Sequence, residues 1–128
     1  MQKGDLLMSS MKIRFSASDV FKFKADALVL PLEKEAWDSD ELFVRINTAL
    51  DGLALKMLRK IDFKAEKNSY FLLQTVGRLP FDNVLFIGLG DESLDAAAVW
   101  DLGAFIVRKA RSRAISSLAI ACDFSSAD

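Results

Sequence analysis

Three continuously apolar runs constrain the fold of this 128-residue chain more than any other feature. They are ALVLPL (27–32), VLFIGL (84–89) and SLAIAC (117–122), and none alternates polar with apolar residues. Runs this short and this apolar are typical of strands that are buried on both faces of a sheet. Such a sheet needs helices on both sides, so the sequence predicts an α/β fold.

Two more runs complete the predicted sheet. MKIRF (11–15) alternates apolar with basic residues, as a half-buried strand does, and YFLLQTV (70–76) is a further strand. Only GRLPFDN (77–83) separates the latter from the next apolar run, which leaves room for a hairpin but not for a helix. That pair is therefore expected to be antiparallel. The gaps 32–70 and 89–118 can each hold a crossover helix, so the predicted sheet is mixed and mainly parallel.

The first helix is predicted to begin near Leu42, because apolar residues recur from there at spacings of three, four or seven. Those residues are Leu42, Phe43, Ile46, Leu50, Leu53, Met57 and Leu58. Asp38 followed by Glu41 has the pattern of an N-terminal capping box. Gly52 is expected to break or bend the helix, and Pro31, which lacks an amide hydrogen, to mark the end of the strand before it.

The second helix is predicted to begin at Ser93, a favoured N-cap, with Asp95 in its first turn. Apolar residues cover a wide part of its surface, so it is expected to be buried on more than one side. Four basic residues stand at its end: Arg108, Lys109, Arg111 and Arg113. They are either a small anion patch or a solvated terminus whose cations offset the helix dipole, and the second interpretation is favoured.

The predicted helices are few for the predicted sheet. Two helices over four or five strands would leave one face thinly covered. We therefore hypothesise that further chain follows residue 128, and that this sequence is a domain cut from a longer protein. MQKGDLLMSS (1–10) lacks the apolar core of a signal peptide and is interpreted as a flexible leader. Residues 11–128 then form a single domain.

Charge and residue counts exclude several classes of function. Seventeen basic and eighteen acidic residues leave a net charge of −1, which gives no overall field to hold nucleic acid or an anionic membrane. The chain has no histidine, so Ser-His-Asp and Cys-His catalysis and the usual zinc sites each lack a required residue. Its single cysteine, Cys122, has no disulfide partner, fits a reducing compartment, and is interpreted as a small buried hydrophobe. No run approaches the ~18 apolar residues of a membrane span.

VLFIGLGDES (84–93) raises the question of a phosphate-binding loop. A dinucleotide fingerprint needs a third glycine where this chain has Ser93, and its strand should open a βαβ unit instead of following a hairpin. Asp91 and Glu92 would also repel a phosphate. The favoured interpretation is that Gly88 and Gly90 let the chain leave a buried strand at positive φ before Ser93 caps the helix.

The acidic residues are interpreted as solvated. Asp91 and Glu92 could ligate a metal ion, but no third ligand supports them. The same interpretation applies to the acids that follow the second apolar strand: Glu33, Glu35, Asp38, Asp40 and Glu41. No metal-ligating residue is therefore assigned.

Aromatic residues offer two alternatives. Trp37 and Trp100 could stack on a ligand, but packing against another domain or subunit is favoured. Phe21 and Phe23 alternate with lysines and are interpreted as an edge segment with one buried face, not as a base-stacking platform.

Four segments in a fixed order carry a resemblance to a known family. They are MKIRF, KADALVLPL, NTALDGLALKMLRKIDFKAEKNSYFLLQT and LPFDNVLFIGLGDESLDAAAVWDLGAFIVRKAR, within residues 11–122. No one of them is diagnostic, but together they resemble the N-terminal domain of the leucyl (cytosol) aminopeptidase family. The resemblance implies a three-layer α/β/α fold similar to macro domains.

The resemblance also implies where catalysis takes place. Members of the family are cytoplasmic, hexameric metalloaminopeptidases that release N-terminal residues such as leucine with two divalent metals, usually zinc or manganese. Their metal ligands and catalytic lysine and arginine lie in a C-terminal domain, on Asn-Thr-Asp-x-Glu-Gly-Arg and Asp-Thr-x-Gly motifs. Neither motif occurs here, and Asn47-Thr48-Ala49-Leu50 shares only two letters with the first. No catalytic, cofactor-binding or metal residue is assigned, and this chain alone is expected to be inactive.

Two functions stay open from the sequence. The first is a non-catalytic N-terminal domain with an assembly or regulatory role, whose partner is its own C-terminal catalytic domain. The alternative is a free-standing macro-like module that binds ADP-ribose or a related nucleotide, which rests on the fold resemblance alone. LEKEAW (32–37) and a lone Asp51-Gly52 stand where macro domains carry an Asn-rich turn and glycine-rich loops. The near-neutral charge gives DNA binding little support.

Overall fold

The computed structural model describes residues 5–8, 11–16, 20–22, 24–91, 96–112 and 115–121. Its strands are β1 (Asp5–Met8), β2 (Met11–Ser16), β3 (Ala25–Glu33), β4 (Tyr70–Gln74), β5 (Phe81–Gly90) and β6 (Ser117–Ala121). Its helices are α1 (Glu41–Ala49), α2 (Leu53–Lys60) and α3 (Ala96–Ser112), with short 3₁₀ turns η1 (Val20–Lys22) and η2 (Trp37–Ser39). The five strands expected from the sequence are thus confirmed, as β2 to β6.

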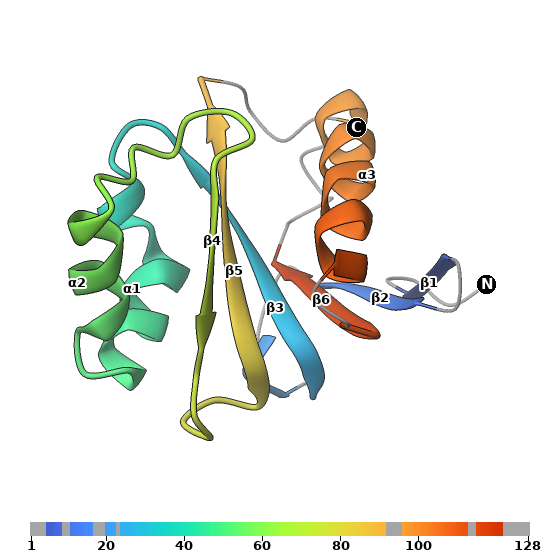
Figure 1. Ribbon diagram of the computed structural model, residues 1–128, viewed down its shortest axis with the longest axis horizontal. Helices are drawn as coiled ribbons and strands as arrows, with labels where there is room; N and C mark the ends of the chain where they lie inside the picture. Colours follow the sequence, from blue (N-terminus) through green and yellow to red (C-terminus); the bar gives the residue numbers. More distant parts are fainter. Residues whose placement is uncertain are drawn as a thin grey trace.

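The strands form one sheet in the order β1-β2-β6-β3-β5-β4. The inner pairs β2–β6, β6–β3 and β3–β5 are parallel, while β1 and β4 join the two edges antiparallel. Helices α1 and α2 lie on one side of the sheet and α3 on the other (Figure 1). The predicted α/β/α architecture with a mixed, mainly parallel sheet is therefore confirmed.

The apolar strands produce this layering because alternate residues point to opposite faces. On one face, Leu28 and Phe86 belong to a buried cluster with Phe43 of α1 and Leu58 of α2. On the other face, Val29 and Ile87 of the sheet belong to a second cluster with Leu102 and Ile106 of α3. Burying a side chain of this size contributes about 1.5–3 kcal/mol. The central strands β3, β5 and β6 are covered on both faces, so the expected thinly covered face is wrong for this part of the sheet.

The N-terminal segment differs from the prediction. Asp5–Met8, which the sequence placed in a leader before the fold, is strand β1 and pairs antiparallel with β2. Its four residues stand between a glycine and two serines and are too few for a periodicity to be read. The fold therefore begins before Met11.

The predicted cap of the first helix also needs correction. Asp40 caps α1, since its Oδ2 accepts a hydrogen bond from the Phe43 amide at 3.0 Å, whereas Asp38 lies in the 3₁₀ turn before it. The chain turns once more at a left-handed Ala36 before α1, which moves the cap two residues along. Gly52 interrupts the helix as expected, at φ 83°, and separates α1 from α2.

Pro31 does not end its strand, because β3 continues to Glu33. Within the described residues, β6 pairs with β3 only over Ala27–Val29, and Pro31 lies beyond the last of these pairs. On that side its missing amide hydrogen interrupts no described pair, so the strand continues.

Helix α3 is described from Ala96, so the predicted cap at Ser93, together with Asp95, lies outside the described residues. The side chains of Arg111 and Arg113, and residue Cys122, lie outside them as well. None of the helices within the described ranges combines the length and apolar character needed to span a membrane.

Candidate functional site

The carboxyl ends of parallel strands are where open α/β sheets bind ligands. Here that edge lies at the ends of β3 and β5, and residues 65–69 run directly against it. The amides of Gly88 and Gly90 donate hydrogen bonds to the carbonyls of Ser69 and Ala65, both at 2.8 Å. Asn68 donates to the Gly88 carbonyl at 3.2 Å. The amides of these two glycines are therefore bonded within the chain and are not free to bind a phosphate.

The two glycines serve different purposes. Gly90 has φ 68°, as predicted for a residue where the chain leaves the strand. Gly88 does not have positive φ, and the prediction for it is wrong. A Cβ at Gly88 would overlap the backbone of Ala65 and the Glu66 carbonyl oxygen, and would lie 2.5 Å from the Ser69 Oγ. Gly88 is therefore needed for close approach of segment 65–69, not for a turn.

The acidic residues do not form a common site. Asp40 caps α1, and Asp38 forms an exposed ion pair with Arg59 at 3.6 Å. Glu33, Glu35, Glu41 and Asp91 are exposed. In the described part of the chain no three His, Cys, Asp or Glu side chains gather into a group that could hold a metal ion, and Glu92 lies outside that part. The donor set of a dimetal centre is thus not offered by the residues described.

The aromatic and basic candidate residues also lie in different surroundings. Trp37 packs edge-on against Phe43 and Phe63 of this domain, with ring centroids 5.4 and 5.3 Å apart, while the expected packing against another domain or subunit stays a prediction. Trp100 is 71% exposed on α3. The Lys109 Nζ lies 4.5 Å from the ring centroid of Tyr70, the first residue of β4, whereas Arg108 is exposed.

Phe21 behaves as the edge-segment interpretation requires, since its ring is partly buried 6.3 Å from that of Phe81. The Arg45 guanidinium lies 4.5 Å from the centroid of the Phe21 ring. Phe23 lies outside the described residues.

The Asp26 carboxylate, which sequence reasoning missed, links β3 to β6 at the amino ends of these strands. Asp26 Oδ2 accepts hydrogen bonds from the Ser116 amide at 2.9 Å, the Ser116 hydroxyl at 2.8 Å and the Ser117 amide at 3.1 Å. The Asp26 amide in turn donates to the Ser117 hydroxyl at 2.8 Å. Hydrogen bonds to the charged form, chiefly from Ser116, lower the pKa of Asp26 below its usual 3.8. Because every donor is committed to Asp26, this cluster holds β3 to β6.

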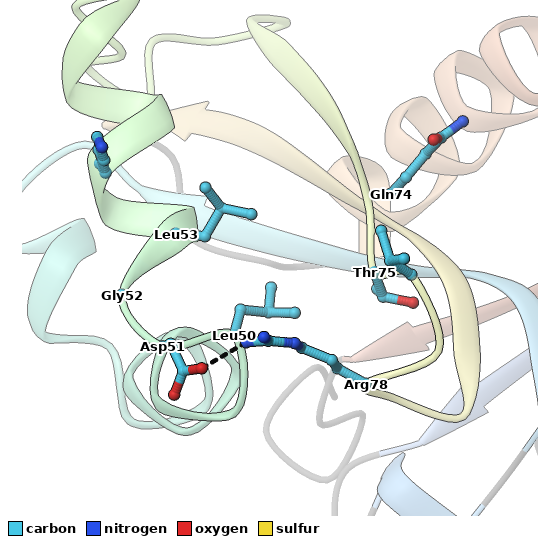
Figure 2. A pocket seen from close by; sticks show the side chains of 9 residues that line it. Leu50, Asp51, Gly52, Leu53, Gln74, Thr75 and Arg78 are labelled. Carbon is cyan, nitrogen blue, oxygen red and sulfur yellow. Dashed lines mark hydrogen bonds and ion pairs between the residues drawn. The ribbon is translucent and has the colours of Figure 1, made fainter.

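An open groove of about 490 Å³ lies between the α1–α2 turn and the β4–β5 hairpin (Figure 2). Leu50 and Leu53 line it on the helical side, and Val76 on the hairpin side. The Arg78 guanidinium and the Asp51 carboxylate, 2.6 Å apart, form an ion pair across it. The hydroxyl of Thr75, the one hydroxyl among the described lining residues, donates to the Phe81 carbonyl. The groove can therefore bind a surface but holds no paired nucleophile and base.

Val76, at the rim of this groove, has an unusual backbone. It has φ 53° and the following Gly77 has φ 79°, and the Arg78 amide donates to the Thr75 carbonyl at 3.2 Å. Two successive positive φ values in a turn closed by this bond give type I′ geometry, which favours Asn or Gly. A β-branched residue there is strained, and the Val76 side chain is 85% exposed. The sequence pair Val-Gly gave no signal of this turn.

The fold defines a class, an α/β/α domain of macrodomain type, in which segment 65–69 covers the end of β5. The structure resembles the macrodomain of Mycobacterium tuberculosis DarG with a TM-score of 0.61 and 13% identity, over 84% of this chain and 74% of that one. It resembles a mutant tomato leucine aminopeptidase with a TM-score of 0.70 and 19% identity, over 84% of this chain and 22% of that one.

The model of the cytosol aminopeptidase family, N-terminal domain, matches residues 29–128. The chain belongs to this family. It is 25% identical over 117 residues to the "Probable cytosol aminopeptidase" of Alkaliphilus oremlandii, covering 88% of this chain and 23% of that protein. The protein of the same name from Geobacter sulfurreducens is 30% identical over 81 residues, covering 63% and 16%. The chain thus spans less than a quarter of the length of these relatives.

Proposed function

We propose that this chain is the non-catalytic N-terminal domain of a leucyl aminopeptidase and acts in assembly or regulation of the catalytic part. Two observations support the proposal: the family match covers residues 29–128, and the amides of Gly88 and Gly90 are bonded to the chain's own carbonyls. The first supports the aminopeptidase context, and the second argues against a phosphate ligand at that edge. A role through protein contacts then fits best.

The remaining parts of the proposal rest on the family. We expect the whole protein to release N-terminal amino acids from peptides with two divalent metals, zinc or manganese, held by a C-terminal catalytic domain. We also expect it to be a cytoplasmic homohexamer. The sequence of this chain carries none of the metal-binding motifs, which supports placing the chemistry elsewhere.

The exposed tryptophan of α3 is the candidate for contact with the catalytic part. Trp100 is 71% exposed, and a large aromatic side chain at the centre of a contact contributes more than its neighbours. The Trp100→Ala substitution removes it without touching either buried cluster.

The test combines binding with activity. The purified chain is mixed with the separately expressed catalytic part of a cytosol aminopeptidase, and complex formation and turnover of a leucyl anilide are measured with manganese or zinc present. We expect no turnover by the chain alone, a complex with the catalytic part, and a weaker complex for Trp100→Ala but not for the control Val44→Ala on α1. Turnover by the chain alone would refute the non-catalytic assignment, and failure to form any complex would refute the assembly role.

The macro-like alternative is tested in parallel by calorimetric titration of the chain with ADP-ribose. Binding would favour a nucleotide module over the assembly domain.

A further inference from the structure

The two edges of the sheet differ in their protection. Strand β1 at one edge has four residues and begins with a charge, Asp5. Strand β4 at the other edge, YFLLQ (70–74), has no charge, and neither does the surrounding run NSYFLLQTVG (68–77). Natural edge strands are usually blocked by lysine, proline, a bulge or covering chain. β4 has no lysine, proline or bulge, no described strand covers it, and its outer edge faces the viewer of Figure 1 between the two helical layers.

The direction of the backbone groups of β4 follows from the two ends of its pairing with β5. The Thr75 amide donates to Asp82, and the Gly88 amide donates to Ser69, so residues 69 and 75 face β5. Hydrogen bonding alternates along an antiparallel pair, and the register is continuous between these points. The backbone groups of Tyr70, Leu72 and Gln74 therefore face outward, where no described strand pairs with them.

The side chains of β4 are incompletely buried on both faces. Tyr70 is 37% exposed and packs edge-on with Phe105 of α3, at 5.9 Å between ring centroids. Leu72 is partly buried in the same cluster as α3, and Phe71 in the cluster with α1 and α2. A strand added beside β4 with apolar residues on both faces would continue both clusters. β4 is itself such a strand.

We propose that β4 is a self-association edge, at which a second copy of this chain pairs antiparallel to join two sheets into one. Centring the twofold axis on Leu72 is the arrangement that pairs all five residues of both strands. It places Tyr70 opposite Gln74 of the second copy and Leu72 opposite Leu72. Left-handed residues Asn68 and Val76, four positions to either side of Leu72, end the pairing symmetrically.

The first test is sedimentation of the 128-residue chain as its concentration is raised. We expect a monomer–dimer equilibrium. The Gln74→Pro substitution removes one outward amide and should abolish the dimer, and Gln74→Lys, a charge on the edge, should raise the dissociation constant at least about tenfold. Gln74 is exposed, so neither change enters a buried cluster. Val44→Lys is the matched control, because it places the same charge on an exposed residue of α1, away from β4, and it should leave the dimer unchanged.

The second test fixes the register by crosslinking in a Cys122→Ser background, which removes the one native cysteine. Leu72→Cys should form an intermolecular disulfide on mild oxidation. Gln74→Cys should not, because the two copies of that position lie roughly 13 Å apart along the strands.

A chain that stays monomeric at every concentration overturns the proposal. So does a dimer that survives both Gln74 substitutions, or one that dissociates instead on Trp100→Lys, which would place the contact on α3. Equal crosslinking at positions 72 and 74 would overturn the Leu72-centred register. Thermal unfolding of each variant at low concentration shows that loss of the dimer is not loss of the fold.

Discussion

The two ends of the β4–β5 pair differ in backbone packing: one end is closely covered by the chain and the other is an exposed turn. Near Gly88 and Gly90, segment 65–69 fits so closely that a single added carbon would overlap it, and the amides of both glycines are bonded. At the hairpin, Val76 holds a strained backbone with its side chain 85% exposed beside an open groove. Among the described residues, the chain therefore covers the end of β5 and leaves open the hairpin and the outer side of β4. This contrast supports the proposed role in protein contacts over the alternative of nucleotide binding.

The largest effect is expected at the closed end. Gly88→Ala places a carbon into the backbone of segment 65–69 and should lower the free energy of unfolding by about 3 kcal/mol or more. Gly103→Ala in α3 is the matched control, because no atom lies within 4 Å of the added carbon. It should raise stability by about 0.5–1 kcal/mol. Urea unfolding measures both, and a Gly88→Ala variant as stable as the wild type would show that the closure is loose.

The strands of this fold were predictable because their apolar runs are local signals. ALVLPL and VLFIGL needed burial on both faces, and the seven-residue gap before the latter required a hairpin. The role of Gly88 was not predictable, because the atoms that exclude a side chain there belong to residues some twenty positions away. The link between Asp26 and Ser116 spans 90 positions. A single sequence carries no local sign of either contact.

The same distinction between local and distant signals applies to the candidate surfaces. The interpretation that GLGDES is no phosphate loop rests on its missing third glycine and βαβ context, and it stays a prediction. The sequence did not reveal that segment 65–69 covers the end of β5. Nor did Val76 stand out, because its strain arises from the turn geometry and not from the residue pattern.

An intermediate effect on stability is expected at the amino ends of β3 and β6, which the Asp26 side chain links. Asp26→Ala removes the acceptor of three hydrogen bonds and should cost about 1–3 kcal/mol at neutral pH. Because folding lowers the pKa of Asp26, its stabilisation is fully present above the unfolded value of about 3.8 and is lost as pH falls through the lower, folded value. Denaturation of wild type and variant from pH 7 to acid should show the difference shrinking only below about pH 4. A constant difference would mean that the charge of Asp26 is not involved.

The smallest effect is expected at the open end, with the opposite sign. Val76→Asn supplies the Asn-Gly pair that type I′ turns favour, and the exposed valine has little buried contact to lose. Stability should rise by about 1 kcal/mol. Val44→Asn, in the regular backbone of α1, should bring no such gain, and thermal unfolding of the two variants compares them. If Val76→Asn is destabilising instead, the valine side chain contributes to the groove in the free chain.

The closed carboxyl edge is tested most directly by amide hydrogen exchange at Gly88 and Gly90, followed by NMR with and without ADP-ribose. We expect slow exchange of both amides in the free chain and no change when ADP-ribose is added. Fast exchange of these amides, or protection that appears only with ADP-ribose, would contradict it and would make the edge of β5 a ligand site.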